Sequence, residues 1–373
     1  KGFTIFYIGI NLGAFLSSLI VGGVGEFIGW HWGFGLAGIA MAFGLIVYLW
    51  GQKYLVNVGN LLSKAERSEG ASLTGLFGDL FNSPVQLVIS SVLMIGSIYV
   101  LIAESVPYGL LCIFLTLVIA MMLMVYKDLT TQVMKDRYVV MLLSFILVIV
   151  FWGAFEQAGG LMNIYALDKT NRSLPFAIPF IGDEVPASWF QSLNALFIIS
   201  FGVLVANFWA RRKLKNKEAS SIFKMAIGVI IMGLGFVFMA AASIQFEANG
   251  SSAMYWLVLA YLFHTIGELS SSPVALSFIT KLAPIKYASL MMGVYFAATG
   301  LGNKLAGILG EFASDAGDLA IFSGITIFTI VFAVIVLIML KPLKRLTHGV
   351  EDEEREMLEQ EQYEIADTER DRK

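Results

Sequence analysis

Two glutamates stand inside long apolar stretches of the sequence. Glu156 follows the run "YVVMLLSFILVIVFWGAF", and Glu268 lies within "YLFHTIGELSSSPVALSF". A charged side chain at the centre of a bilayer costs about 2.5–3.5 kcal/mol on insertion scales, so an acid in such a place predicts a functional site. A carboxylate there can bind and release a proton, or hold a cationic group. The alternatives are a membrane-interface position for Glu156 and a purely structural hydrogen bond for Glu268.

The neighbours of Glu268 extend this candidate site. His264 precedes it by four residues and shares its helical face. Pro273 follows three serines, and we expect it to break or kink the helix and to free carbonyl groups that line a cavity. A metal site or an acid–base pair of an intramembrane enzyme, built from His264 and Glu268, is a further alternative. The sequence contains neither H-E-x-x-H nor G-x-S-x-G, so we predict no enzyme, no metal site and no cofactor.

These acids must be positioned by membrane-spanning helices. Of 373 residues, 57% are apolar and 14% are charged, against about 25% charged in soluble domains, and the mean hydropathy is +0.76. About 20 apolar residues cross a hydrocarbon core of about 30 Å. The sequence therefore predicts an all-α polytopic membrane protein with spans near 3–25, 31–51, 85–103, 107–126, 138–163, 187–210, 223–243, 253–280, 287–309 and 320–340.

Lysine and arginine alternate between the loops that join these spans. Seventeen of these residues fall in one set of loops and two fall in the other set. Because positive residues collect on the cytoplasmic side, the pattern predicts a multi-pass protein of the cytoplasmic (inner) membrane with both ends of the chain cytoplasmic. The predicted partner surface is the lipid bilayer, and no nucleic acid partner is expected.

Three further polar residues are candidates. Asn11 and Asn194 are amides at the middle of predicted spans, where they either bind a ligand or join helices by hydrogen bonds worth about 0.6 kcal/mol on average. Asp168 lies twelve residues after Glu156. It is either a carboxylate of an outer gate or an ordinary loop acid.

Four stretches together resemble the proton-dependent oligopeptide transporter family of the major facilitator superfamily. They are "FTIFYIGINLGAF", "FWGAFEQ", "WFQSLNALFI" and "GELSSSP", and they occur in the order that the family shows. The pair of spans within 85–126 also resembles the extra hairpin found between the two halves of bacterial members. The resemblance covers residues 2 to 345.

The resemblance implies a major facilitator fold with an incomplete N-terminal bundle and a complete six-helix C-terminal bundle. Residues 1–51 would be the last two helices of the N-terminal bundle, and 52–137 a cytoplasmic linker with the extra hairpin. Residues 138–345 would form the C-terminal bundle, and 346–373 a charged cytoplasmic tail. The chain starts abruptly at Lys1 without methionine, so we expect it to be a fragment whose first four helices, its intramolecular partners, are missing.

The resemblance also implies a function and roles for residues. It predicts proton-coupled symport of di- and tripeptides by alternating access, with H+ as the coupling ion and a small peptide as the substrate. Another facilitator substrate, such as nitrate or a drug-like molecule, is the alternative. The implied substrate-binding residues are Asn11, Trp152, Asn194 and Glu268, with Tyr295 and Phe296 where many members have tryptophan; Glu156 would couple protons and Asp168 would help to close the outer gate.

Overall fold

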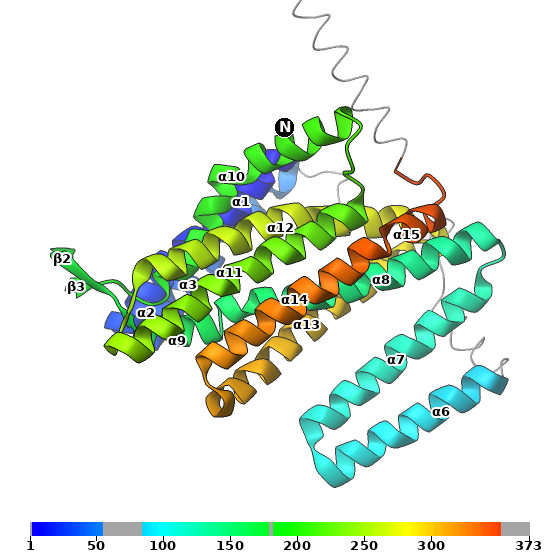
Figure 1. Ribbon diagram of the computed structural model, residues 1–373, viewed down its shortest axis with the longest axis horizontal. Helices are drawn as coiled ribbons and strands as arrows, with labels where there is room; N and C mark the ends of the chain where they lie inside the picture. The colour runs from blue at the N-terminus through cyan, green and yellow to red at the C-terminus, as the bar shows by residue number, and fades with distance from the viewer. Residues whose placement is uncertain (1, 55–83, 179–181, 352–373) are drawn as a thin grey trace, which may run out of the picture.

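The structure is a computed structural model that describes residues 2–54, 84–178 and 182–351. Long helices dominate it (Figure 1). The N-terminal part and the hairpin consist of α1 (Gly2–Leu16), a π-helical turn (Ser17–Gly22), α2 (Gly23–Phe27), α3 (Trp30–Gly51), α6 (Pro84–Tyr99), a second π-helical turn (Val100–Glu104) and α7 (Val106–Asp128).

The remainder of the chain forms a helical bundle with short strands in its loops. Its elements are α8 (Gln132–Phe155), α9 (Leu161–Lys169), β1 (Thr170–Asn171), β2 (Ser173–Ile178), β3 (Gly182–Glu184), α10 (Trp189–Leu214), α11 (Ser221–Asn249), β4 (Ser252–Ala253), α12 (Met254–Leu282), α13 (Ala288–Ala316), α14 (Asp318–Ile338) and α15 (Leu340–Leu346). β1 pairs with β4 in parallel and β2 pairs with β3 antiparallel. The prediction of an all-α architecture is confirmed, with these two small sheets as its only described strands.

Each of the ten predicted spans is occupied by helix. In the described residues, eight helical segments are long and apolar enough to cross a membrane. The helices α12 and α13 are outside these eight although each has 29 residues. Polar side chains lower their apolarity, and α12 is the helix that carries Glu268.

Residues with special backbone preferences set several helix ends. Thr131 caps α8, because its hydroxyl oxygen accepts a hydrogen bond from the backbone N–H of Met134 at 3.2 Å. Pro107 occupies the first turn of α7, where no N–H is needed. Gly250 ends α11 with a φ of 74°, and Gly317 separates α13 from α14 with a φ of 81°. The apolar runs are thereby divided into separate helices.

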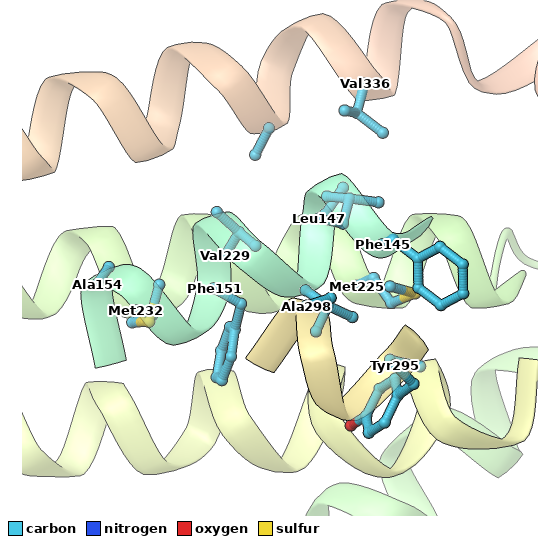
Figure 2. Packing of buried hydrophobic residues seen from close by; sticks show 14 of the residues in the cluster. Phe145, Leu147, Phe151, Ala154, Met225, Val229, Met232, Tyr295, Ala298 and Val336 are labelled. Carbon is cyan, nitrogen blue, oxygen red and sulfur yellow. The ribbon is translucent and has the colours of Figure 1, made fainter. Parts of the chain in front are cut away.

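The core lies where α8, α11, α13 and α14 meet (Figure 2). Phe151 from α8, Met232 from α11 and Val336 from α14 are all nearly inaccessible to solvent. Tyr295 and Ala298 of α13 close the cluster from another side. This apolar packing fixes the helices that carry the polar candidates.

The contact between α11 and α12 is a direct contact of backbones. An ideal Cβ placed on Gly267 would lie 2.6 Å from the carbonyl oxygen of Gly228, and one placed on Gly228 would lie 2.6 Å from the carbonyl oxygen of Gly267. Glycine at both positions is therefore required for the close approach, as small residues often are between membrane helices. Glu268 is the next residue after this contact.

The structure bears on helix continuity at two places. Of the break or kink expected at Pro273, the break is absent, because α12 runs from Met254 to Leu282 with Pro273 inside it. The long contact of α12 with α11 supplies packing that outweighs the hydrogen bond lost at one proline. By contrast, α8 ends at Phe155, and Glu156 begins a short 3-10 turn inside the predicted span 138–163.

The loops lie at the two ends of the bundle. Loops rich in lysine and arginine lie at one end, and loops poor in these residues lie at the other. At the lysine-poor end, Lys169 is paired with Asp318, and β1 pairs with β4. At the lysine-rich end, Lys286 binds Asp128 at 2.8 Å and Lys344 binds Glu218 at 2.8 Å. Loops of like composition therefore share an end of the molecule.

The hairpin α6–α7 lies at one edge of the bundle (Figure 1). The hydroxyl of Tyr138 in α8 donates a hydrogen bond to the carbonyl oxygen of Met122 in α7 at 2.8 Å, which joins the hairpin to the core. Most large apolar side chains of α6 are exposed. Residues 55–83 of the predicted linker and hairpin (52–137) and residues 352–373 of the predicted tail (346–373) lie outside the described residues.

Candidate functional site

Asn194 of α10 and Glu268 of α12 are in direct contact. The Asn194 side-chain amide donates to Glu268 Oε2 at 2.7 Å and to Thr265 Oγ1 at 3.1 Å. The Thr265 hydroxyl in turn donates to the carbonyl oxygen of Tyr261 at 2.7 Å, so it is free to accept from Asn194. Two residues that the sequence singled out separately therefore form one polar unit, and the amide fixes the orientation of the carboxylate.

Glu156 lies close enough to Glu268 for the two carboxylates to interact electrostatically. Glu156 is half-buried at the junction of α8 and the 3-10 turn. Its neighbour Gln157 is buried and donates to the carbonyl oxygens of Gly153 and Ala306, each at 3.2 Å. The turn that carries Glu156 is therefore tied to α13.

Aromatic residues pack between α8, α12 and α13. Trp152 makes an edge contact with Phe155, with ring centroids 5.3 Å apart. Tyr295 interacts with the side chains of Trp152 and Ser272, and it is only 6% exposed, whereas the adjacent Phe296 is 65% exposed. Trp152 and Tyr295 therefore lie close together, while Phe296 points away from the packed core.

His264 is packed rather than coordinated. Its ring centroid lies 4.5 Å from that of Phe236, and a Cβ on Gly235 would lie 2.5 Å from the ring, so glycine makes room for it. Within the described residues neither ring nitrogen has a hydrogen-bond partner, and no group of three His, Cys, Asp or Glu residues has the arrangement of a metal site. The observed environment is therefore that of a packed aromatic ring.

Asn11 and Asp168 occupy different environments. Asn11 is buried on α1, one turn before Phe15, whose carbonyl oxygen accepts from Ser192 of α10 at 3.4 Å. Asp168 is exposed on α9. Its neighbour Lys169, rather than Asp168, forms the ion pair with Asp318 that ties α9 to α14.

A second carboxylate site joins α2 to the start of α10, and the sequence analysis missed it. Glu26 accepts hydrogen bonds from the backbone N–H groups of Ala187 at 2.9 Å and Ser188 at 2.7 Å. The buried Arg172 lies 4.0 Å from Glu26 and 2.8 Å from Glu184. The only sequence signal for this site was that Glu26 lies in a loop without lysine or arginine. Its partners lie about 160 residues further along the chain, so the sequence did not indicate them.

The fold and the site define a multi-pass membrane protein whose polar groups lie between helices. The sequence matches the family described as PTR2, POT family, over residues 1–323. The chain belongs to the POT family. Its relatives are transporters, so the protein is a transporter and not an enzyme.

Known relatives match almost the whole chain. The peptide transporter YePEPT of Yersinia enterocolitica subsp. palearctica is 30% identical over 371 residues, which are 95% of this chain and 70% of that protein. The di-/tripeptide transporter of Lactococcus lactis subsp. cremoris is 28% identical over 94% of this chain and 69% of its own length.

Solved structures agree with the observed fold. A crystal structure of a peptide transporter POT in complex with sulfate has a TM-score of 0.70 at 30% identity, covering 92% of this chain and 68% of that chain. A POT family transporter in complex with a thioalcohol-conjugated peptide has a TM-score of 0.70 at 25% identity, covering 92% and 69%.

Proposed function

We propose that this protein carries out proton-coupled symport of di- and tripeptides by alternating access. Membership of the POT family supports the class, and the names of the relatives support the substrate. The observation that carries the proposal is the contact between Asn194 and Glu268, with Glu156 close enough to interact. Transport of nitrate or a drug-like molecule has no comparable support from the named relatives.

Glu268 is the residue that we assign to the amino terminus of the peptide. The Asn194 amide uses Oε2 of the carboxylate, and we assign Oε1 to the ammonium group of the substrate. A hydrogen bond with a charged partner is worth about 1.5–3 kcal/mol, more than a neutral one. Trp152, Tyr295, Phe296 and Asn11 complete the proposed substrate-binding residues.

Glu156 is the residue that we assign to proton coupling. Two ionised carboxylates within interaction range repel each other, and the repulsion grows in a medium of low dielectric constant. A proton on one of them, or an ammonium group between them, removes the repulsion. Proton binding at Glu156 and peptide binding at Glu268 are then linked, as symport requires.

The remaining assignments concern the arrangement of the chain. We propose that residues 1–51 correspond to the last two helices of an N-terminal bundle. Residues 52–137 then connect it to the six-helix bundle of 138–345, and 346–373 form a charged tail. We place the protein in the cytoplasmic membrane with both ends of this chain cytoplasmic, following its lysine-rich loops.

The contacts at the lysine-poor end are assigned to closure of the outer side. Asp168 keeps its proposed gating role, and Glu26 joins it because it links α2 to α10. Rocking of two bundles around a central site would make and break such contacts. The bundle interface, rather than a single residue, is the proposed gate.

Uptake by full-length protein in proteoliposomes tests the proposal. With an imposed proton gradient, labelled dipeptide should accumulate, and Glu268→Gln should abolish both accumulation and peptide exchange without a gradient. Glu156→Gln should abolish accumulation and leave exchange, because only the proton step is removed. Glu247→Gln, an exposed acid at the end of α11, is the matched control.

Two results would contradict these assignments. Gradient-driven accumulation that persists in both Glu156→Gln and Glu268→Gln would refute the site. Equal uptake of nitrate or an uncharged drug-like compound, with none of the dipeptide, would refute the substrate class.

A further inference from the structure

An apolar groove opens on the outside of α10, α11 and α12. It encloses about 530 Å³, and its walls include Leu204, Phe208, Phe223, Ile227 and Ile266. Leu204 and Phe208 are 62% and 57% exposed. The side chains assigned above to the substrate and to the proton are not among its lining residues.

The floor of the groove contains Trp209. Its indole N–H donates to the hydroxyl oxygen of Ser270 at 3.2 Å, which holds the ring in place. Tryptophan with a satisfied N–H and an apolar face is typical of the level where acyl chains meet lipid headgroups. The groove therefore lies near the membrane surface at the lysine-rich end of α10.

Basic side chains form one rim of this groove. A second hollow of about 380 Å³ shares Leu204, Phe208 and Arg212 with the groove, and it adds Arg211, Lys215 and Lys217. Arg211, Lys215 and Lys217 are exposed. Among the described residues that line the two hollows, none is acidic.

Arg212 connects the basic rim to the apolar walls. Its Nε donates to the carbonyl oxygen of Glu218 at 2.7 Å, and its guanidinium carbon lies 5.4 Å from the centre of the Phe223 ring. The nearby carboxylate of Glu218 is paired with Lys344. The positive charge at the mouth of the groove is therefore fixed in position and is not neutralised by Glu218.

We propose that this groove binds an anionic phospholipid, with one acyl chain between α10 and α11 and the phosphate headgroup at Arg211, Arg212, Lys215 and Lys217. Apolar walls match an acyl chain in chemistry, and basic pockets between membrane helices match anionic headgroups. A free phosphate would use the rim and leave the apolar surface uncovered. The combination of both surfaces selects a lipid.

Quenching of tryptophan fluorescence tests this site in the full-length protein. The probes are phosphatidylglycerol and phosphatidylcholine with brominated acyl chains, each mixed into phosphatidylcholine vesicles over the same series of mole fractions. The fluorescence of Trp209 is obtained as the difference in tryptophan fluorescence between the natural protein and Trp209→Phe. Phosphatidylglycerol should quench this fluorescence at lower mole fraction than phosphatidylcholine does.

A pair of double variants isolates the rim. Each basic residue near a membrane surface contributes about fivefold to anionic lipid association, so Arg211→Gln with Lys215→Gln should weaken phosphatidylglycerol quenching about 25-fold. Lys341→Gln with Arg345→Gln removes two exposed charges from α15 at the same end of the molecule, and it should change quenching less than twofold.

Equal quenching by both lipids would overturn the lipid site, and so would unchanged quenching in the Arg211/Lys215 variant. Quenching by neither lipid would also overturn it, because it would mean that a protein segment fills the groove. Displacement of the brominated lipid by inorganic phosphate alone would also overturn it. None of these measurements requires transport, so they are independent of the proposed function.

Discussion

The carboxylates of Glu268 and Glu26 both accept hydrogen bonds from nitrogen donors, yet the charged groups near them differ. Glu26 accepts from two backbone N–H groups and lies near the buried Arg172. Glu268 accepts from the neutral amide of Asn194 and interacts with a second carboxylate, Glu156. A carboxylate with fixed donors and a cation is a structural contact, whereas one beside another carboxylate is suited to receive a cation or a proton.

The largest expected difference between the two acids is in ligand binding. Glu268→Gln should weaken binding of a dipeptide about 10- to 150-fold, because a charged hydrogen bond is worth about 1.5–3 kcal/mol and 1.4 kcal/mol is a factor of ten. Glu26→Gln should change the same affinity less than twofold. Isothermal titration with the purified protein measures both, and equal losses in the two variants would remove the distinction.

The packing beside Glu268 offers a second comparison. Gly267→Ala should lower the free energy of unfolding by about 1–3 kcal/mol, because the new methyl group would meet the backbone of Gly228. Gly300→Ala in α13 has open space around the added Cβ and should be neutral or slightly stabilising. Thermal unfolding in detergent compares them, and similar melting temperatures for both variants would contradict the close contact.

Glu26 should matter more for stability than for binding. Glu26→Gln keeps one carbonyl oxygen as an acceptor, replaces the other by an NH2 donor and removes the charge. One of the two backbone N–H groups then loses its partner, so we expect a loss of about 1–3 kcal/mol. Glu184→Gln removes the other, exposed carboxylate beside Arg172 and should have a smaller effect. The ranking is measured by thermal unfolding, and a larger loss for Glu184→Gln would reverse our interpretation of the contact.

A third carboxylate, Glu218 at the lysine-rich end, should have the smallest effect. Burial raises the pKa of Glu218, but hydrogen bonds from Lys344 and Ser220 outweigh burial and hold the pKa below its usual value. The stabilisation is therefore present above the unfolded-state pKa, and it is lost as the pH falls through the folded-state pKa. Glu218→Gln should lower stability by less than about 1 kcal/mol at neutral pH.

The same variant provides its own control through pH. The melting temperatures of the natural protein and of Glu218→Gln should converge as the pH falls from neutral through the lowered folded-state pKa of Glu218. A difference that stays constant over this range would show that the ion pair with Lys344 is not its source.

The sequence predicted the helices and the acids inside them because both signals are local. A polar side chain within an apolar run is visible in about 20 residues, and so Glu156, Glu268 and Asn194 could be singled out. The sequence left a break or a kink open at Pro273 and could not predict that α12 continues, since a proline acts locally while the contact with α11 is a property of the whole helix. Glu26 was missed for the same reason, because its partners approach only in the folded chain.

The contact between Gly228 and Gly267 limits how this protein can change shape. Side chains at an ordinary helix interface can swap rotamers to let one helix slide, but two touching backbones have no such freedom. α11 and α12 must therefore travel as one rigid unit, and Glu268 is carried with both. Any motion that alters access to Glu268 has to occur where α12 meets α10, α8 or α13, because side chains separate the helix backbones at these interfaces.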